Sequence, residues 1–176
     1  MEHRRGIVMR VSPIMLPVNG DYMRSIFELL GSRVERHWSY RDITVFYRPD
    51  LDGGGRHMSY FFVNHISKQI ANGHRYRHVF EWCSGPGFIG FALLAQGLCQ
   101  RICLADVNAD AIACARKTAE ENGLLDKVDL FVSDNLTSVP SDLRFDLVVS
   151  NPPNYYGLNP RHPVYAKMSE IGRAHV

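Results

Sequence analysis

A glycine-rich turn between an apolar strand and an apolar helix constrains the fold of this chain more than any other feature. Residues 77–83 (RHVFEWC) have the composition of a strand and run through SGPGFIG into the helical stretch FALLAQG. Gly85, Gly87 and Gly90 fit the spacing G-x-G-x-x-G, in which glycine permits a tight turn and a close approach of backbone to ligand. The turn predicts a sheet whose strands alternate with helices.

The segments after this turn continue the alternation. The predicted elements are helices over 88–97 and 109–122 and strands over 101–106, 128–133 and 145–150. Such an order is typical of a parallel, doubly wound α/β sheet with right-handed crossovers. Asp106 ends the second strand and follows Gly85 by 21 positions, the place of a carboxylate that binds ribose hydroxyls.

A second motif, Asn151-Pro152-Pro153, stands directly behind the apolar run 145–150 (FDLVVS). It therefore falls at the carboxyl end of a strand, where open α/β sheets bind their ligands. Two prolines hold the turn rigid and lack N–H donors, which leaves the Asn151 amide and the backbone carbonyls to face a ligand. Together they offer an acceptor pair for an NH2 group. Asn-Pro is also an ordinary turn dipeptide, and on this motif alone that interpretation stays open.

Glu81 distinguishes between two cofactors. The glycine pattern by itself suits a nicotinamide-dependent oxidoreductase equally well. The pyrophosphate of a dinucleotide is anionic and favours a helix N-terminus, whereas S-adenosylmethionine carries an ammonium and a sulfonium that favour carboxylates. Glu81 stands four residues before Gly85, and together with the Asn151 motif it favours S-adenosylmethionine.

From Glu81 to Tyr156 the chain resembles the class I S-adenosylmethionine-dependent methyltransferases of the Asn-Pro-Pro type. Four blocks stand in that family's order: EWCSGPGFIG, LADVNADAI, VSDNL and SNPPNYY. The resemblance implies a Rossmann-like fold and methylation of a nitrogen conjugated to a planar group. Members of the family methylate release-factor glutamine, adenine N6 of DNA or RNA, or guanine N2 of ribosomal RNA. The implied partner is therefore a protein or a nucleic acid.

The resemblance also assigns roles to individual residues. The cofactor-binding residues that it implies are Glu81, Cys83, Gly85, Gly87, Asp106, Val107, Asp134 and Asn135. Glu81 and the amides near the glycines would hold the methionine end, Asp106 the ribose, and the last three the adenine. Asn151 and the Pro152 carbonyl would accept both N–H groups of the target nitrogen, so that its lone pair turns toward the methyl group without a strong base.

One position departs from the family pattern. The residue after the two prolines is usually aromatic and stacks on the planar target, but here it is Asn154. We expect Tyr155 to take this place as a third catalytic residue. The alternative is that Tyr155 and Tyr156 only cover the end of the sheet.

The first 56 residues predict a small α+β appendage to a core over 57–169. Its expected parts are an irregular arm over 1–20, a helix over Tyr22–Leu30, a hairpin joining 36–40 to 41–48, and, leading into the core, a helix over 57–71. In glutamine methyltransferases a segment similar to Arg48-Pro49-Asp50 lies near the methionine end of the cofactor. A glycine-rich linker is the alternative for this stretch.

Charge is distributed unevenly along the chain. Residues 1–80 carry a net charge of +5 and residues 81–176 a net charge of −3. Arginines alternate with aromatic residues between Arg33 and Arg48, a pattern that hints at contact with nucleic acid. An ordinary solvated surface explains the same charges, and that interpretation stays open.

Composition excludes several other classes. The chain has no apolar run of about 18 residues, and its N-terminus lacks the apolar stretch of a signal peptide, so we expect a cytoplasmic protein. The cysteines form no C-x-x-C pair and predict reduced thiols and no metal site; they are Cys83, Cys99, Cys103 and Cys114.

The C-terminal residues predict an incomplete sheet. A sheet of this family continues for three more strands after the Asn-Pro-Pro strand, and residues 170–176 (EIGRAHV) translate a common sequencing adapter in frame. We therefore expect a truncated reading frame, an uncovered edge at strand 145–150, and a poorly soluble, inactive fragment. A non-catalytic RNA- or protein-binding module stays open as an alternative.

Overall fold

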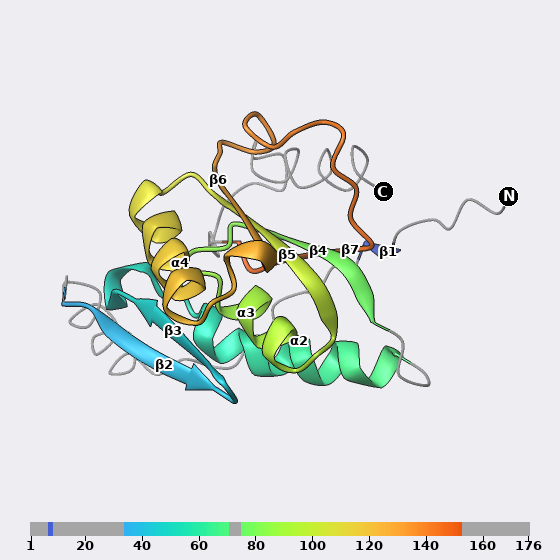
Figure 1. Cartoon of the computed structure of the whole chain (residues 1–176), viewed down its shortest axis with the longest axis horizontal. Coiled ribbons are helices and arrows are strands. Elements are labelled where there is room, and N and C mark those ends of the chain that lie inside the picture. Colours follow the sequence, from blue (N-terminus) through green and yellow to red (C-terminus); the bar gives the residue numbers. More distant parts are fainter. Residues whose placement is uncertain (1–6, 9–33, 71–74, 153–176) are drawn as a thin grey trace, which may run out of the picture.

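The computed structural model describes residues 7–8, 34–70 and 75–152, which form a parallel sheet covered by helices and a hairpin (Figure 1). The sheet strands are β1 (Ile7–Val8), β4 (Tyr76–Trp82), β5 (Cys99–Asp106), β6 (Val128–Val132) and β7 (Leu147–Ser150). The hairpin strands are β2 (Arg36–Tyr40) and β3 (Ile43–Tyr47). The helices are α2 (Gly55–Gln69), α3 (Phe88–Ala95) and α4 (Ala109–Glu121), with short 3-10 turns η1 (Pro49–Leu51) and η2 (Leu125–Lys127).

The sheet has the order β1-β7-β4-β5-β6, and every neighbouring pair is parallel. This confirms the predicted parallel α/β sheet. The central strand is β4, whose Val79 stands in register with Leu147 of β7 and Ile102 of β5. Because these strands run in the same direction, the glycine turn, Asp106 and Asn151 all arrive at one edge of the sheet.

The prediction of an uncovered edge at residues 145–150 is wrong. The strand is shorter than expected, and Ile7 and Val8 of β1 pair with Leu147 and Val148 on the side away from β4. A two-residue strand has no periodic pattern that could be recognised in the sequence. The rest of the predicted arm, and the predicted helix Tyr22–Leu30, lie outside the described residues.

The two faces of the sheet are buried by different elements. Helices α2, α3 and α4 and the hairpin pack on one face, against the side chains of Val79, Ile102, Leu104, Leu147 and Val149. In the described part of the chain, the other face is covered by segment 133–146, where Phe145 stacks on Phe80 with ring centroids 4.9 Å apart. Figure 1 shows the three helices on one side of the sheet and this orange segment on the other. Burial on both faces explains why the strands are almost continuously apolar.

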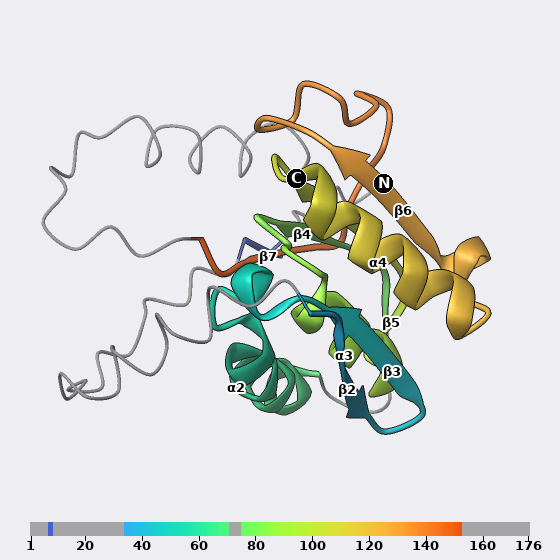
Figure 2. The same cartoon turned by 90° about the vertical axis from the view of Figure 1, so that its left-hand side faces the viewer.

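The predicted hairpin is confirmed, and α4 holds it against the core. Ile43, Val45 and Tyr47 are buried in the same core as the three helices. The free edge of β3 is closed by side chains of α4 and its C-cap: Thr44 N donates to Asn122 Oδ1 (2.9 Å) and Phe46 N donates to Thr118 Oγ1 (2.9 Å). In Figure 2 the hairpin lies alongside α4.

These bonds satisfy backbone groups that an open strand edge would leave to other chains. The domain boundary at residue 56 stays a prediction, with residues on both sides of it in one core. None of the helices in the described ranges is long and apolar enough to cross a membrane.

Candidate active site at the carboxyl edge of the sheet

A cavity of about 380 Å³ opens where four parallel strands end. Its walls come from the ends of β4, β5, β6 and β7 and from residues 50–53 and Gly55. Eight of the predicted site residues line it: Glu81, Cys83, Gly85, Asp106, Val107, Asp134, Asn135 and Asn151. Residues scattered over 70 positions of the sequence therefore meet in one cavity, as expected for an open α/β sheet.

Two predicted residues are absent from the cavity wall, and a third lies outside the described residues. Gly87 is not among the residues that line the cavity, and Pro152, half-buried behind Asn151, is not among them either. Tyr155 lies outside the described residues. Their roles stay predictions.

Gly87 is required by packing behind the cavity. Its φ of 84° lies in the left-handed region, and it forms the N-cap of α3. A Cβ at this position would lie 2.5 Å from Leu104 Cδ1, so the side chain of β5 fills the space that glycine leaves. The turn is closed by Gly87 N, which donates to Ser84 O at 2.9 Å. Glycine at this position therefore lets α3 pack closely on the sheet.

Glu81 points from β4 into the N-terminal end of α3. Its side chain is 2% exposed, and Oε2 accepts a hydrogen bond from Gly90 N at 2.7 Å. Burial raises the pKa of this carboxyl to about 8, although the hydrogen bonds from the Gly90 and Ile89 amides oppose the rise. The side chain thus occupies the helix terminus that an anionic ligand would need, and it lines the cavity at the same time.

Asp106, at the end of β5, connects the glycine turn to the start of α4. Oδ2 accepts from Gly85 N at 2.8 Å, and Oδ1 accepts from Asn108 N at 2.9 Å. Asn108 in turn caps α4, since its Oδ1 accepts from Asp110 N at 3.0 Å. A carboxylate oxygen has two lone pairs, so each oxygen of Asp106 keeps an acceptor site for a ligand hydroxyl. Next to it, Val107 is 71% exposed.

The cavity is acidic. Five carboxylate residues line it: Asp50, Asp52, Glu81, Asp106 and Asp134. Among the described residues, none of those lining it is a lysine, arginine or histidine. Two of the five are paired with arginines outside the lining, Asp50 with Arg48 (2.6 Å) and Asp52 with Arg56 (3.3 Å). A cavity with this set of side chains favours a cationic ligand.

The Asn151 side chain is hydrogen-bonded to the loop that contains Gly53. Its Nδ2 donates to the carbonyl oxygen of Gly53 at 3.3 Å. Because a carbonyl oxygen can accept only from the NH2 end of the amide, this contact determines the orientation of Asn151. Oδ1 therefore points away from Gly53 and keeps its acceptor capacity.

Sequence reasoning treated this loop, residues 48–55, only as a weak correspondence, yet it supplies five of the residues that line the cavity: Asp50, Leu51, Asp52, Gly53 and Gly55. Arg48 anchors it, donating from Nε and Nη2 to Asp50 (3.0 and 2.6 Å) and from Nη1 to Asp110 of α4 (2.9 Å). The sequence feature that indicated this loop was the Arg-Pro-acid segment 48–50. No sequence feature indicated that Arg48 would pair with Asp110, 62 positions away.

The cysteine in the cavity is a neutral thiol. Burial, together with the nearby carboxylates Asp106 and Glu81, raises the pKa of Cys83 to about 12. All four cysteines are free, with Cys99 and Cys103 buried and Cys83 and Cys114 half-buried. Within the described residues, no group of three or more histidine, cysteine, aspartate or glutamate side chains could hold a metal ion.

Comparison with known families places residues 39–175 in a single match, to the methyltransferase small domain. The ribosomal RNA small subunit methyltransferase C of Actinobacillus succinogenes is 31% identical over 127 residues, 72% of this chain and 33% of that protein. The ribosomal protein L11 methyltransferase of Haemophilus influenzae is 36% identical over 75 residues, 43% of this chain and 24% of that protein. The chain thus spans a third or less of the length of these relatives.

Solved structures show the same fold. The T. Thermophilus 16S rRNA N2 G1207 methyltransferase, in complex with AdoMet and guanosine, aligns with a TM-score of 0.59 at 23% identity, over 71% of this chain and 34% of that one. The ribosomal protein L11 methylase of Lactobacillus delbrueckii subsp. bulgaricus aligns with a TM-score of 0.50 at 18% identity, over 68% and 55%. At these identities the likeness establishes the Rossmann-like fold.

Proposed function

The chain belongs to the methyltransferase small domain family, and on that basis we propose that it transfers a methyl group from S-adenosylmethionine to a conjugated NH2 nitrogen of a macromolecule. The observation that carries the proposal is the acidic cavity with Asn151 in its wall. Its carboxylates suit a cofactor that has both an ammonium and a sulfonium group.

The same observation weighs against a nicotinamide cofactor. A dinucleotide places its pyrophosphate on the free amides of the helix that follows the glycine turn. Here the Gly90 amide donates to Glu81, whose carboxyl occupies that position. An anionic pyrophosphate would also meet the carboxylates of the cavity, and no cationic side chain among the described lining residues would offset them.

We assign the cofactor-holding residues by chemistry. When bound, S-adenosylmethionine supplies an electrophilic methyl group on a positively charged sulfur. The acidic side chains of the 50–53 loop provide negative charge for the ammonium and sulfonium groups. The Glu81 carboxyl, whose pKa of about 8 keeps it largely protonated at neutral pH, offers an oxygen as a hydrogen-bond acceptor. The remaining lone pairs of Asp106 accept ribose hydroxyls, and the exposed side chain of Val107 offers an apolar surface for adenine. Asp134 and Asn135 lie at the end of β6 as acceptors for the adenine edge.

Asn151 and the Pro152 carbonyl would hold the acceptor. Gly53 fixes the amide so that Oδ1 is free to accept one N–H of the target, and the Pro152 carbonyl accepts the other. Both bonds hold the nitrogen's lone pair out of conjugation and stabilise the positive charge that develops on nitrogen. The methylated nitrogen would lose its proton to water only after transfer, so the chemistry asks for no strong base.

RNA and ribosomal protein are the acceptor classes that the relatives suggest. One named relative is a ribosomal RNA methyltransferase and the other a ribosomal protein L11 methyltransferase. Both carry out methyl transfer to a component of the ribosome, and we extend that general class to this chain.

Calorimetry and a transfer assay test the proposal. The expected inactivity rested on an uncovered edge at β7, and β1 pairs with that edge. We therefore expect the protein to bind S-adenosylhomocysteine and S-adenosylmethionine but not NAD⁺, and to transfer tritiated methyl groups into either the RNA or the protein fraction of a ribosome preparation. Asp106→Ala should weaken cofactor binding, while Asp126→Ala, at an exposed position of η2, serves as a control. Tighter binding of NAD⁺ than of S-adenosylhomocysteine would refute the proposal, and cofactor binding without transfer would favour a non-catalytic module.

A further inference from the structure

We propose that the exposed side of α2 and the adjoining strand β2 bind single-stranded RNA. The inference rests on the proposed function, because it names the substrate class of the same site. The aromatic–cationic face, as we call this surface, comprises Arg36, Trp38 and Tyr40 of β2 and Arg56, His57, Tyr60, Phe61, His65 and Lys68 of α2.

The charge of α2 differs from that of an ordinary surface helix. Its 15 residues, GRHMSYFFVNHISKQ, include no aspartate or glutamate. His57, Phe61, His65 and Lys68 are all exposed, and their spacings of four, four and three residues place them along one stripe of the helix. By contrast, α4 mixes Asp110, Glu120 and Glu121 with its bases, as solvated helices usually do. A polyanion would therefore meet no repulsion along α2.

The aromatic residues of this face are exposed and held in position. Tyr60 is 52% exposed and Phe61 41% exposed. Tyr60 packs edge-on against Trp38 (5.9 Å between ring centroids) and tilted against Tyr40 (5.5 Å). Phe61 contacts the His57 ring at 5.4 Å. Rings held by their neighbours lose little conformational freedom when a base stacks on them.

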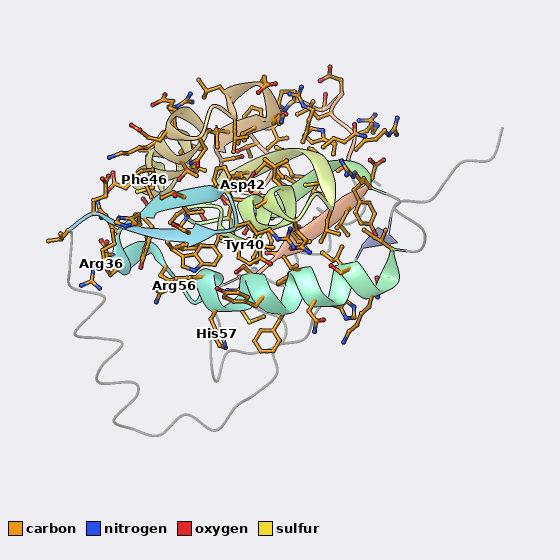
Figure 3. The ribbon with its side chains drawn as sticks, turned by 60° about the horizontal axis from the view of Figure 1, so that its bottom comes forward. Arg36, Tyr40, Asp42, Phe46, Arg56 and His57 are labelled. Carbon is orange, nitrogen blue, oxygen red and sulfur yellow. The ribbon has the colours of Figure 1, made fainter. Side chains whose placement is uncertain are left out.

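Two of the cations around these rings are available to phosphate groups, and a third is partly engaged within the protein. Arg36 and Lys68 are exposed and form no ion pair with any residue in the described part of the chain. Arg56 is 47% exposed, lies over the Tyr47 ring at 5.5 Å and pairs with Asp52. Figure 3 shows Arg36, Arg56 and His57 projecting outward from β2 and from the first turn of α2.

The face begins at the rim of the cavity. Gly55, the first residue of α2, lines the cavity, and so does Asp52, the ion-pair partner of Arg56. From there α2 extends for 15 residues, or about 22 Å at 1.5 Å per residue. A strand of RNA lying along α2 would therefore lead to the cavity that contains Asn151.

Single-stranded RNA fits this chemistry better than a duplex or an acidic protein. Exposed rings stack on unpaired bases, whereas a duplex hides its base faces. Lysine and arginine between the rings neutralise phosphates, which gives a strong dependence on salt. An acidic protein would use the cations but gain little from flat, half-exposed rings.

The test is fluorescence anisotropy with a labelled oligouridylate of about 12 nucleotides, within the length that single-strand binding folds contact. It is run with and without S-adenosylhomocysteine, and against the duplex of the same RNA with oligoadenylate. The face variant is Arg36→Glu with Lys68→Glu. The control is Arg116→Glu with Lys127→Glu, which makes the same change in charge at two exposed residues elsewhere.

We expect the single strand to bind more tightly than the duplex, and the face variant to lose at least tenfold in affinity while the control stays within threefold. The slope of log affinity against log salt should fall in magnitude by about 1.4, or roughly 0.7 for each phosphate that is no longer neutralised. Phe61→Ala should weaken binding at least about fivefold, because a base can no longer stack on the ring. Tyr60→Phe, which keeps the ring, should bind as wild type does.

The outcomes separate this inference from the proposed function. Equal losses of affinity in the face variant and the control, tighter binding of the duplex, or no RNA binding at all would each overturn the RNA face. If the face variant binds RNA normally but transfers fewer tritiated methyl groups to the protein fraction, the surface binds a protein substrate and the inference fails. Asp106→Ala should weaken cofactor binding by roughly 10–100-fold but leave oligouridylate binding intact, so failure of the cofactor site would be recognised separately.

Discussion

The cavity and the aromatic–cationic face share a border and have opposite construction. In the cavity, four of the five carboxylate residues are buried or half-buried, and among these Glu81 accepts a hydrogen bond from the backbone amide of Gly90 and Asp106 one from that of Gly85. On the face, Arg36 and Lys68 are exposed and form no ion pair within the described ranges. The segment from Asp50 to His57 crosses from one region to the other.

On the functions proposed above, this contrast would let the two regions bind ligands of opposite charge. A cationic cofactor needs a few carboxylates held in a fixed geometry, because a small displacement of a group that contacts the ligand weakens the interaction strongly. A polyanionic acceptor needs only cations and rings spread along a surface, and each contributes a little. We therefore expect single substitutions in the cavity to have large effects and those on the face to have small, additive ones.

The largest effect should come from Asn151→Ala. Removing the preorganised acceptor for the target N–H should lower the turnover number by about 10²–10³-fold, as the loss of one polar group facing a developing charge typically does. Cofactor affinity should change little, because the Asn151 amide contacts Gly53 rather than the glycine turn. Single-turnover methyl transfer and calorimetry with S-adenosylhomocysteine separate the two. A wild-type rate would make Asn151 a simple turn residue.

Gly87→Ala should destabilise the fold by about 2–4 kcal/mol, because a left-handed backbone and a Cβ 2.5 Å from Leu104 both oppose the new methyl group. Gly123→Ala is the matched control: its φ of 65° is also positive, but a Cβ there would meet nothing within 4 Å. Urea unfolding gives the free energy of unfolding of both variants, and the difference between their losses of stability measures the contribution of packing. Equal losses of stability would show that strain of the backbone alone is responsible.

Asp106→Ala should weaken cofactor binding by roughly 10–100-fold, the equivalent of a charge-assisted hydrogen bond of about 1.5–3 kcal/mol. Part of this loss of affinity is indirect: the Gly85 and Asn108 amides donate to this carboxylate, so removing it also loosens the glycine turn and the start of α4. Calorimetry checks the prediction. An affinity within twofold of wild type would remove Asp106 from the cofactor site.

Glu81→Gln should change the pH dependence of stability. The folded-state pKa of about 8 lies above the ordinary value of 4.5, so the folded chain binds the extra proton between these limits. The contribution of Glu81 is full below about 4.5 and is lost as the pH rises through about 8. Glutamine keeps an acceptor for Gly90 N without this titration, so the variant should gain on wild type as pH rises. Urea unfolding from pH 5 to pH 9 measures the free energy of unfolding of both proteins. A difference between variant and wild type that does not change with pH would contradict the raised pKa of Glu81.

The smallest effect is expected when the aromatic–cationic face is changed and cofactor binding in the cavity is measured. Arg36→Glu with Lys68→Glu should leave the affinity for S-adenosylhomocysteine within twofold, because neither residue lines the cavity and exposed charges are screened over about 10 Å. Calorimetry at physiological salt tests this. A larger change would mean that the two regions are electrostatically coupled and that the comparison fails.

Sequence patterns, together with the family resemblance, predicted eight residues of the cavity wall. The glycine turn and the Asn-Pro-Pro motif each depend on neighbours within about ten residues, and the carboxylate at the end of β5 is recognised from its spacing of 21 positions after Gly85. Apolar periodicity and turn chemistry act over short ranges, so they predicted the parallel strands and singled out Glu81, Gly85, Asp106 and Asn151. The other four predicted residues of the cavity wall, Cys83, Val107, Asp134 and Asn135, came from the resemblance to the methyltransferase family. The hairpin was also predictable, because alternation in RDITVFYR is a local signal.

What these residues contact was settled by tertiary folding alone. Glu81 was predicted to face the cofactor, and folding also places it against the Gly90 amide at the start of α3. The Gly53 carbonyl holds Asn151 across 98 positions of sequence, Arg48 reaches Asp110, and Ile7 and Val8 cover β7. Such contacts form because apolar faces must be buried and backbone groups paired within one packed body, and a local window of sequence contains no record of which distant segment will do so.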